Sequence, residues 1–114
     1  MRKPPLNAGR LRHRVRLERL VVTQDPDTGA TSETWQTVVD SLAAAIEPLS
    51  VKDLIAAQTV KSAVTVRLVI RWRAGLDLRT RFVGSDGTVY RPQGFLPDAD
   101  SGREYVTAPC RIGD

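Results

Sequence analysis

Residues 9–20 read Gly-Arg-Leu-Arg-His-Arg-Val-Arg-Leu-Glu-Arg-Leu, an almost unbroken alternation of basic and mostly apolar side chains. Alternate side chains of an extended strand point to opposite faces. One face of the predicted strand therefore carries Leu11, Val15 and Leu17, with His13 among them. The other face carries a row of arginines that ends at Glu18. The row consists of Arg10, Arg12, Arg14 and Arg16.

Length and composition indicate one small globular domain. The chain has 114 residues, of which 41% are hydrophobic and 26% are charged, values typical of a folded, soluble protein. We expect a flexible N-terminal arm at residues 1–9 and a single β-barrel domain at residues 10–114. No apolar run is long enough to cross a membrane, no signal-type segment follows the basic start, and the single cysteine, Cys110, excludes an internal disulfide.

The charge is distributed unevenly along the chain. Residues 1–19 contain seven Lys/Arg and one acid, a net charge of +6, and residues 20–114 contain ten Lys/Arg and twelve acids, a net charge of −2. Together they give the +4 of the whole chain. Such an asymmetry favours an anionic partner, either nucleic acid or an acidic patch on a protein.

The hydrophobic pattern predicts a mainly β fold, a small antiparallel β-barrel or sandwich with one short helix. Strands are expected at about 10–23, 31–46, 61–73, 79–83, 88–92 and 103–112, with the fifth continuing towards residue 96. The first two strands form a long hairpin around the Asp-, Pro- and Gly-containing turn at 24–30. Ser50 is expected to cap a helix at 51–58, with Asp53 in the place of the usual capping Glu.

No motif points to catalysis, and we expect no metal or cofactor. His13 and Cys110 match no metal-ligand spacing, and a half-buried histidine with an apolar cysteine explains both residues more simply than a catalytic pair. Residues 25–29 resemble the opening of a calcium loop, but Gln36 stands where that loop needs Glu, so a hairpin turn is preferred. Asp98 and Asp100 are interpreted as a solvated turn rather than a catalytic dyad.

The arginine row has three interpretations. It is a solvated face that blocks unwanted strand pairing, a nucleic-acid surface, or a protein interface in which Arg pairs with carboxylates. Nucleic-acid-binding barrels usually add exposed aromatic side chains for base stacking. The chain contains two Trp, two Tyr and two Phe, and several of these are needed in the core.

Six segments of the chain, taken in their order and spacing, carry a family resemblance. They are residues 9–14, Trp35, Ala-Ile-Glu-Pro-Leu-Ser at 45–50, Ala-Ala-Gln at 56–58, Ile-Arg-Trp-Arg at 70–73 and Gly-Thr-Val-Tyr at 87–90. From about residue 8 to residue 111, the chain resembles the head-tail joining proteins of long-tailed bacteriophages and prophages, also called head-closure, stopper or head-tail connector proteins. The departures from the family pattern are Gly-Phe-Leu at 94–96 and Pro109.

The resemblance implies a structural virion protein at the head-tail interface, present in the host cytoplasm during assembly. It implies a ring of about twelve copies between the portal or adaptor protein and the tail or tail-terminator protein. The ring would join head to tail and would gate or retain packaged double-stranded DNA in its channel. We expect no membrane partner.

Two sets of residues follow as candidate functional surfaces. The candidate assembly interface joins the arginine row to three small residues that permit close approach of a neighbour: Arg10, Arg12, Arg14, Arg16, Ala43, Ala44 and Ala45. Family members have a long loop between the second and third strands that can project into the channel, here about residues 47–62. Its candidate channel-facing residues are Glu47, Ser50, Lys52, Asp53, Gln58 and Lys61. The alternative function is a small nucleic-acid-binding β-barrel that acts alone.

Overall fold

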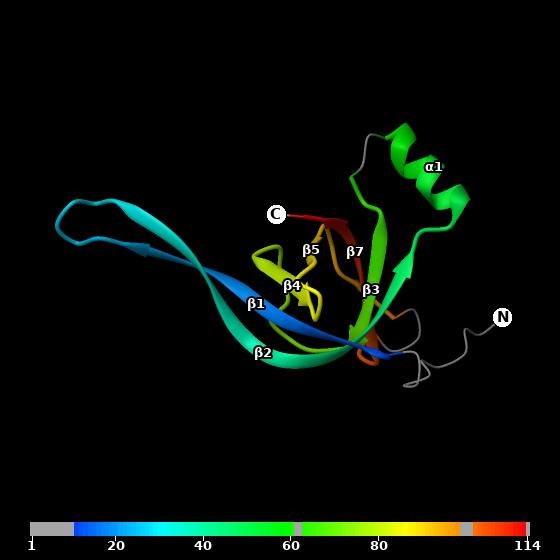
Figure 1. The fold of residues 1–114 in the computed structure, drawn as a ribbon, viewed down its shortest axis with the longest axis horizontal. Coiled ribbons are helices and arrows are strands. Elements are labelled where there is room, and N and C mark those ends of the chain that lie inside the picture. Colours follow the sequence, from blue (N-terminus) through cyan, green and yellow to red (C-terminus); the bar gives the residue numbers. More distant parts are fainter. Residues whose placement is uncertain (1–10, 61–62, 99–101, 114) are drawn as a thin grey trace.

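The computed structural model describes residues 11–60, 63–98 and 102–113. The strands are β1 (His13–Gln24), β2 (Thr31–Pro48), β3 (Val66–Arg71), β4 (Thr80–Gly84), β5 (Val89–Pro92), β6 (Leu96–Pro97) and β7 (Tyr105–Ile112), and α1 (Val51–Thr59) lies between β2 and β3. The predicted mainly β fold with one short helix is therefore confirmed (Figure 1). The predicted arm at 1–9 and the candidate residues Arg10 and Lys61 lie outside the described residues.

The strands form one antiparallel sheet in the order β3-β2-β1-β4-β5-β7-β6. The sheet closes on itself because β3 also pairs with β7, from Val66 opposite Cys110 to Arg71 opposite Tyr105. Closure is uneven, since the described pairing of β4 with β5 consists of Phe82–Tyr90 and Val83–Val89 alone. The result resembles a barrel more than two separate sheets, and closure leaves few strand edges open around the core.

The core lies inside this closed sheet and is built by strand alternation. Inward residues alternate with outward ones along β3, where Leu68 and Ile70 are fully buried. The same period holds in β7, where Val106, Ala108 and Cys110 face the core. The core residues are Val15, Leu17, Ala44, Leu68, Ile70, Phe82, Tyr90, Val106, Ala108 and Cys110.

The start of the chain departs from the predicted single apolar face. Val15 and Leu17 enter the core, but Leu11 packs with Ala45 and Val69 in a separate cluster. Leu11 precedes the first residue of β1, so strand alternation does not fix its direction. His13 is exposed, and the expectation of a half-buried histidine was wrong.

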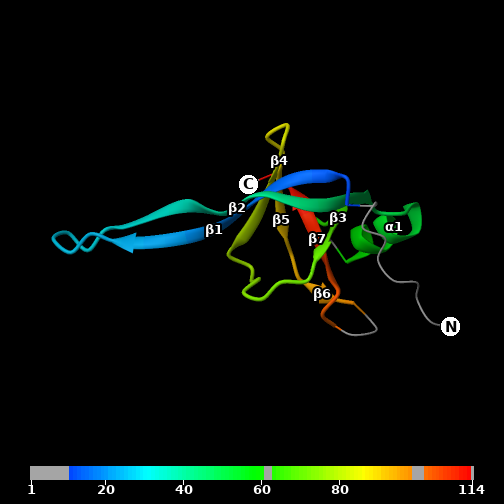
Figure 2. The same cartoon turned by 90° about the horizontal axis from the view of Figure 1, so that it is seen from below.

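The β1–β2 hairpin is longer than the barrel that holds its base. Strand β4 pairs with β1 at residues 15–19, and β3 pairs with β2 at residues 44–48. Beyond these contacts the two strands pair with each other out to Gln24 and Thr31. Figures 1 and 2 both show this two-stranded ribbon projecting from the barrel. We call residues 20–38 the hairpin arm.

Two register irregularities bend β2 at the base of the hairpin arm. Val15 lies opposite Leu42, Leu17 opposite Val39 and Glu18 opposite Thr37. Strand β2 therefore spends two more residues than β1 over the same span, as β-bulges do. An added residue on one strand bends it and increases its twist, which explains the strong curvature of β2 in Figure 1.

The turn at the tip of the hairpin arm is the predicted one. The Asp25 backbone N–H donates to the Ala30 carbonyl at 2.7 Å, and the Gly29 N–H donates to the Asp25 carbonyl at 2.8 Å. Gly29 has a φ of 73°, a conformation that glycine adopts without steric cost. The hairpin-turn interpretation of residues 25–29 is thus confirmed.

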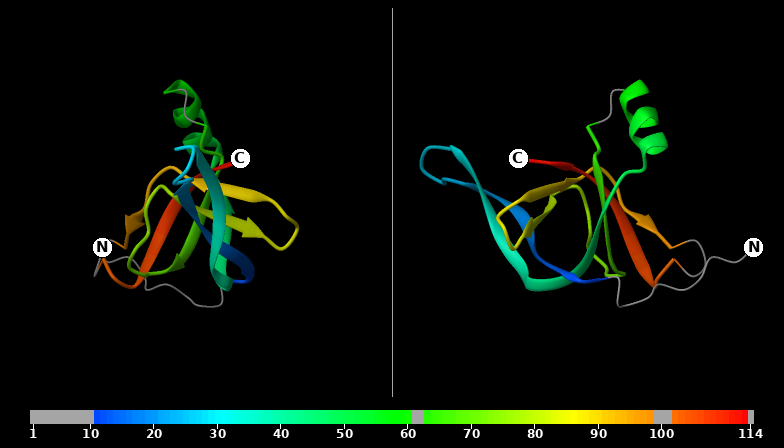
Figure 3. Two further views of the ribbon diagram at one scale, coloured as in Figure 1. Left: turned by 90° about the vertical axis from the view of Figure 1, so that its left-hand side faces the viewer. Right: turned by 45° about the vertical axis from the view of Figure 1, so that its right-hand side comes forward.

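Helix α1 also forms as predicted, but it does not pack on the barrel. The Asp53 N–H donates to Ser50 Oγ at 3.2 Å, which confirms Ser50 as the N-cap. None of the residues 51–59 is buried, and Val51 and Ile55 are 76% and 58% exposed. Figure 3 shows the helix standing clear of the sheet. The apolar side of the helix is therefore uncovered in the single chain.

Two other strands are shorter than expected. Strand β3 begins at Val66 rather than near residue 61 and ends before Trp72, which is 40% exposed. The chain does not extend β5 past Pro92. It turns instead, and Leu96 and Pro97 pair with Thr107 and Val106 as the separate strand β6.

Candidate functional site

The arginine row of β1 is present on the surface in its described part. Arg12, Arg14 and Arg16 are all exposed, as predicted. Arg12 precedes the strand, whereas Arg14 and Arg16 alternate with the buried Val15 and Leu17. The row therefore lies on the outer surface of the barrel at the start of β1.

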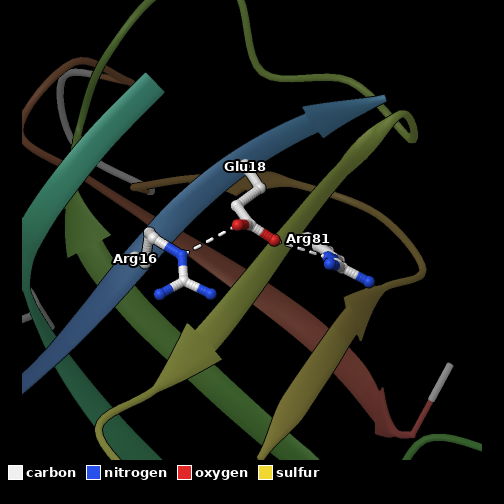
Figure 4. A network of polar contacts seen from close by, with 3 residues as sticks. All are labelled: Arg16, Glu18 and Arg81. Carbon is white, nitrogen blue, oxygen red and sulfur yellow. Dashed lines mark hydrogen bonds and ion pairs between the residues drawn. The ribbon is translucent and has the colours of Figure 1, made fainter. Parts of the chain in front are cut away.

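The last member of that row, Glu18, behaves differently from the prediction. It is 5% exposed, and Arg16 Nε and Arg81 Nε donate to its two carboxylate oxygens at 2.8 and 2.7 Å (Figure 4). Burial works to raise the pKa of Glu18, but the hydrogen bonds and charges of Arg81 and Arg16 outweigh burial and lower it. Glu18 is therefore an ionised bridge between β1 and β4, and it engages one of the three surface arginines.

A second contact, missed from the sequence, continues this network onto the hairpin arm. The guanidinium carbon of Arg81 lies 4.3 Å from the centre of the Trp35 ring, and that of Arg91 lies 5.0 Å from it. Cation–π contacts of this length are attractive. Trp35 sits opposite Leu20 in the arm, so these arginines tie the arm to β4 and β5. The sequence signal was a lone tryptophan in a polar strand.

The three alanines of the candidate assembly interface occupy different environments. Ala44 is fully buried in the core, and Ala45 is 4% exposed beneath Leu11. Ala43 is partly exposed. The small side chains of Ala44 and Ala45 therefore serve packing within the chain, and Ala43 is the one that reaches its surface.

The candidate channel-facing residues are mostly on α1. Lys52, Asp53 and Gln58 are exposed on the helix, directly after its cap at Ser50. Glu47 lies within β2, partly buried and opposite Arg67 of β3. Figures 1 and 2 show α1 and the hairpin arm leaving the barrel on different sides. The two projecting elements are thus separate surfaces.

The thiol of Cys110 is chemically inert in the folded chain. It is fully buried, and its Sγ donates to the Ala108 carbonyl at 3.3 Å. Burial raises its pKa to about 12, so the thiolate that a nucleophile requires does not form near neutral pH. His13 is exposed while Cys110 is in the core, which does not suit a catalytic pair.

The expectation of a solvated turn at Asp98 was wrong. Asp98 is 7% exposed, and its carboxylate accepts hydrogen bonds from the backbone N–H groups of Gly102, Glu104 and Tyr105. A buried carboxylate is retained here because it satisfies donors of the loop before β7. Asp100, its proposed neighbour, lies outside the described residues.

The described residues form neither a metal-binding cluster nor a membrane-spanning helix. Within 11–60, 63–98 and 102–113, no group of three or more His, Cys, Asp or Glu is placed to hold a metal ion. In the same residues, no helix has the length and apolar character needed to span a bilayer.

Comparison with known proteins identifies the family. The family model for the phage head completion protein matches residues 6–113. The chain belongs to the phage head completion protein family. This confirms the resemblance to head-tail joining and head-closure proteins seen in the sequence, and it places the chain among the structural proteins of the phage head. The family implies a virion location and contacts with other head or tail components.

One solved structure supports the fold of this head completion protein. The solution structure of protein SF1141 from Shigella flexneri 2a is 32% identical to it, with a TM-score of 0.74. The comparison covers 95% of this chain and 97% of SF1141. Among curated proteins, none matches the chain.

Proposed function

We propose that this head completion protein forms a ring between the portal or adaptor and the tail, joins head to tail, and gates or retains packaged DNA. The family match over residues 6–113 carries the proposal. The fold adds a physical reason, because two elements project from a small barrel with little packing of their own. Projecting elements of this kind gain stability when neighbouring subunits cover them. The ring of about twelve copies is the assembly that the resemblance implies.

In this proposal, the surface arginines at the start of β1 contact an acidic surface on a neighbour or on the adaptor. Replacement of Arg16 would also break its ion pair with the buried Glu18, so the test changes the other two exposed arginines of the row, Arg12 and Arg14. We expect the double variant Arg12→Glu/Arg14→Glu to fold but to leave DNA-filled heads without tails in a complementation assay. The matched control is Arg71→Glu/Arg79→Glu, which reverses two exposed arginines elsewhere on the surface. Normal head–tail joining by the double variant would contradict this role.

The α1 segment faces the channel in this proposal, where Lys52 lies near DNA. Because Cys110 is buried, a Lys52→Cys variant carries one accessible thiol. We expect maleimide labelling at position 52 to be slow in DNA-filled heads and fast in emptied ones. Thr34→Cys on the hairpin arm is the control and should label equally in both. Equal labelling at position 52 in full and empty heads would argue against a channel position.

Binding of free DNA separates this function from a nucleic-acid-binding barrel that acts alone. The Trp35 ring is already covered by Arg81 and Arg91, which leaves it poorly placed for base stacking. We expect the purified protein to ignore free double-stranded DNA at physiological salt. Tight binding with a steep salt dependence would favour the solitary barrel instead.

A further inference from the structure

The hairpin arm is acidic, with its carboxylates at the tip and on the outer part of β2. Residues 20–51 contain no lysine or arginine, and their acidic residues are Asp25, Asp27, Glu33, Asp40 and Glu47. The first three lie on the arm itself, and all three are exposed. Two exposed valines, Val22 at 51% and Val38 at 50%, lie among them.

The arm is also a ribbon with unused pairing capacity. A two-stranded hairpin is marginally stable in water without a further strand or a packed face. The described pairing joins β2 residues 31–43 to β1 alone, and β4 leaves β1 at Arg19. The arm therefore offers apolar side chains, backbone edges and negative charge to a partner.

The start of β1, at the other end from the tip of the arm, is basic and lies beside a surface hollow. His13 and Arg14 are exposed there and line a hollow of about 260 Å³ with the β4–β5 turn at 84–86 and Tyr90. The turn contributes one carboxylate, Asp86, which accepts the Thr88 N–H at 3.0 Å and so is held to its own turn. The hollow thus presents the Arg14 guanidinium beside an opening large enough for a side chain.

One chain cannot bring its own two ends together. Arg14 and Asp25 are eleven residues apart on an extended strand, up to about 36 Å at roughly 3.3 Å per residue. Figure 1 shows the start of β1 and the tip of the arm on opposite sides of the barrel. Complementary charges that the strand holds this far apart do not meet within one chain, whereas two copies can bring them together.

We propose that the hairpin arm of one copy docks against the Arg14 end of β1 in the next copy. This rests on the proposed ring, and it names the contact that builds it. The contact is heterologous, a head-to-tail joint of unlike surfaces, and repetition of such a joint closes a ring when the rotation fits. Phosphate-bearing partners do not suit the arm, because its charge repels them, whereas the arginines of a second copy do.

A charge-swap experiment on the full-length protein tests the contact. One variant is Asp27→Lys/Glu33→Lys, which reverses the arm, and the other is Arg14→Glu, which reverses its receptor. Each variant alone brings like charges together, so we expect its self-association at low salt to weaken by about tenfold or more relative to the unchanged protein. In an equimolar mixture every joint regains opposite charges, and association should recover. Sedimentation velocity and light scattering give the masses.

The controls change the net charge equally at other surfaces. Asp40→Lys/Glu104→Lys, at two exposed acids outside the hairpin arm, matches the arm variant, and Arg71→Glu matches the receptor variant. Both controls should associate like the unchanged protein. High salt should weaken the native association, because the paired charges are exposed and screened.

Three results would overturn the docking proposal. They are an unchanged protein that stays monomeric at low salt, single variants that associate normally, and a mixture that fails to recover. If the variants associate normally yet no longer bind DNA-filled heads, the arm serves another virion protein rather than a second copy. Failure of the ring function itself is scored separately, by head–tail joining in the complementation assay.

Discussion

The two halves of the β1–β2 hairpin carry apolar side chains in opposite environments. In the inner half Val15 and Leu17 are 1% and 3% exposed, whereas in the outer half Val22 and Val38 are 51% and 50% exposed. The difference lies in the neighbours, since β4 and β3 flank the inner half and end before the outer half begins. An apolar side chain on a strand becomes buried only where further strands flank that strand and another layer of protein faces it.

The largest expected effect breaks the inner half. Leu17→Ala removes a side chain from the closed core and should lower the free energy of unfolding by about 2–5 kcal/mol. Val22→Ala on the outer half should change it by less than about 0.5 kcal/mol. Chemical denaturation of the two variants measures both values. Equal destabilisation would show that the arm is packed in solution.

The next effect concerns the boundary between the halves, at Glu18. Glu18→Gln removes the charge that Arg16 and Arg81 share and should cost roughly 2 kcal/mol at neutral pH. The lowered pKa of Glu18 means that this stabilisation is complete above the usual value of 4.5 and is lost as pH falls through the folded-state value. The difference in free energy of unfolding between the unchanged protein and Glu18→Gln should therefore become smaller as the pH drops below 4.5.

An exposed ion pair supplies the control for Glu18. Arg19 and Asp77 lie 2.8 Å apart with side chains 43% and 45% exposed. Asp77→Asn should change stability by less than about 1 kcal/mol at any pH. A pH profile of Glu18→Gln that runs parallel to the unchanged protein would contradict the buried bridge.

A smaller effect is expected from Trp35→Leu, which should destabilise the outer half of the hairpin and leave the core unchanged. Trp35→Leu keeps an apolar side chain but removes the ring beneath Arg81 and Arg91, and it should cost about 1 kcal/mol. Hydrogen exchange should quicken in residues 20–24 and 31–38, while that of β3 and β7 should follow only the global change. Unchanged exchange in the arm would mean that other contacts hold it.

The smallest effect is at the tip of the arm. The Asp27 N–H donates to Asp25 Oδ1 at 2.9 Å, and this bond lowers the pKa of Asp25. Asp25→Ala should leave the unfolding midpoint unchanged, because the tip is fully exposed, and should speed exchange of the Asp27 amide. A clear drop in the midpoint would instead make the turn part of the cooperative unit.

The sequence predicted what depends on local rules. The turn at 24–30 and the Ser50 cap both follow from short-range chemistry, and the structure confirms each. Where the hairpin leaves the barrel depends on the lengths of β3 and β4, which are distant in sequence. The burial of Glu18 depends on Arg81, 63 residues away.

The candidate functional surfaces also include features that the sequence predicted and features that only the structure showed. The exposed arginines followed from alternation, but the split of Ala43, Ala44 and Ala45 between surface, core and outer cluster needed the positions of Leu11 and β3. The covering of Trp35 by two arginines joins three strands. The acidic arm and its basic counterpart became visible as a pair only when the strand between them was seen to hold them apart.

The buried thiol of Cys110 is a built-in probe of local opening of the barrel. Cys110 lies on β7, opposite Val66 of β3 and Pro92 of β5, at the strand that seals the sheet. An alkylating reagent reaches its sulfur only while the pairing of β7 with its neighbours is open. The reaction rate therefore reports how often the barrel opens locally. The alkylation rate of Cys110 can be compared between free subunits and finished particles, without any change to the sequence. A slower rate in particles would show that assembly suppresses this opening.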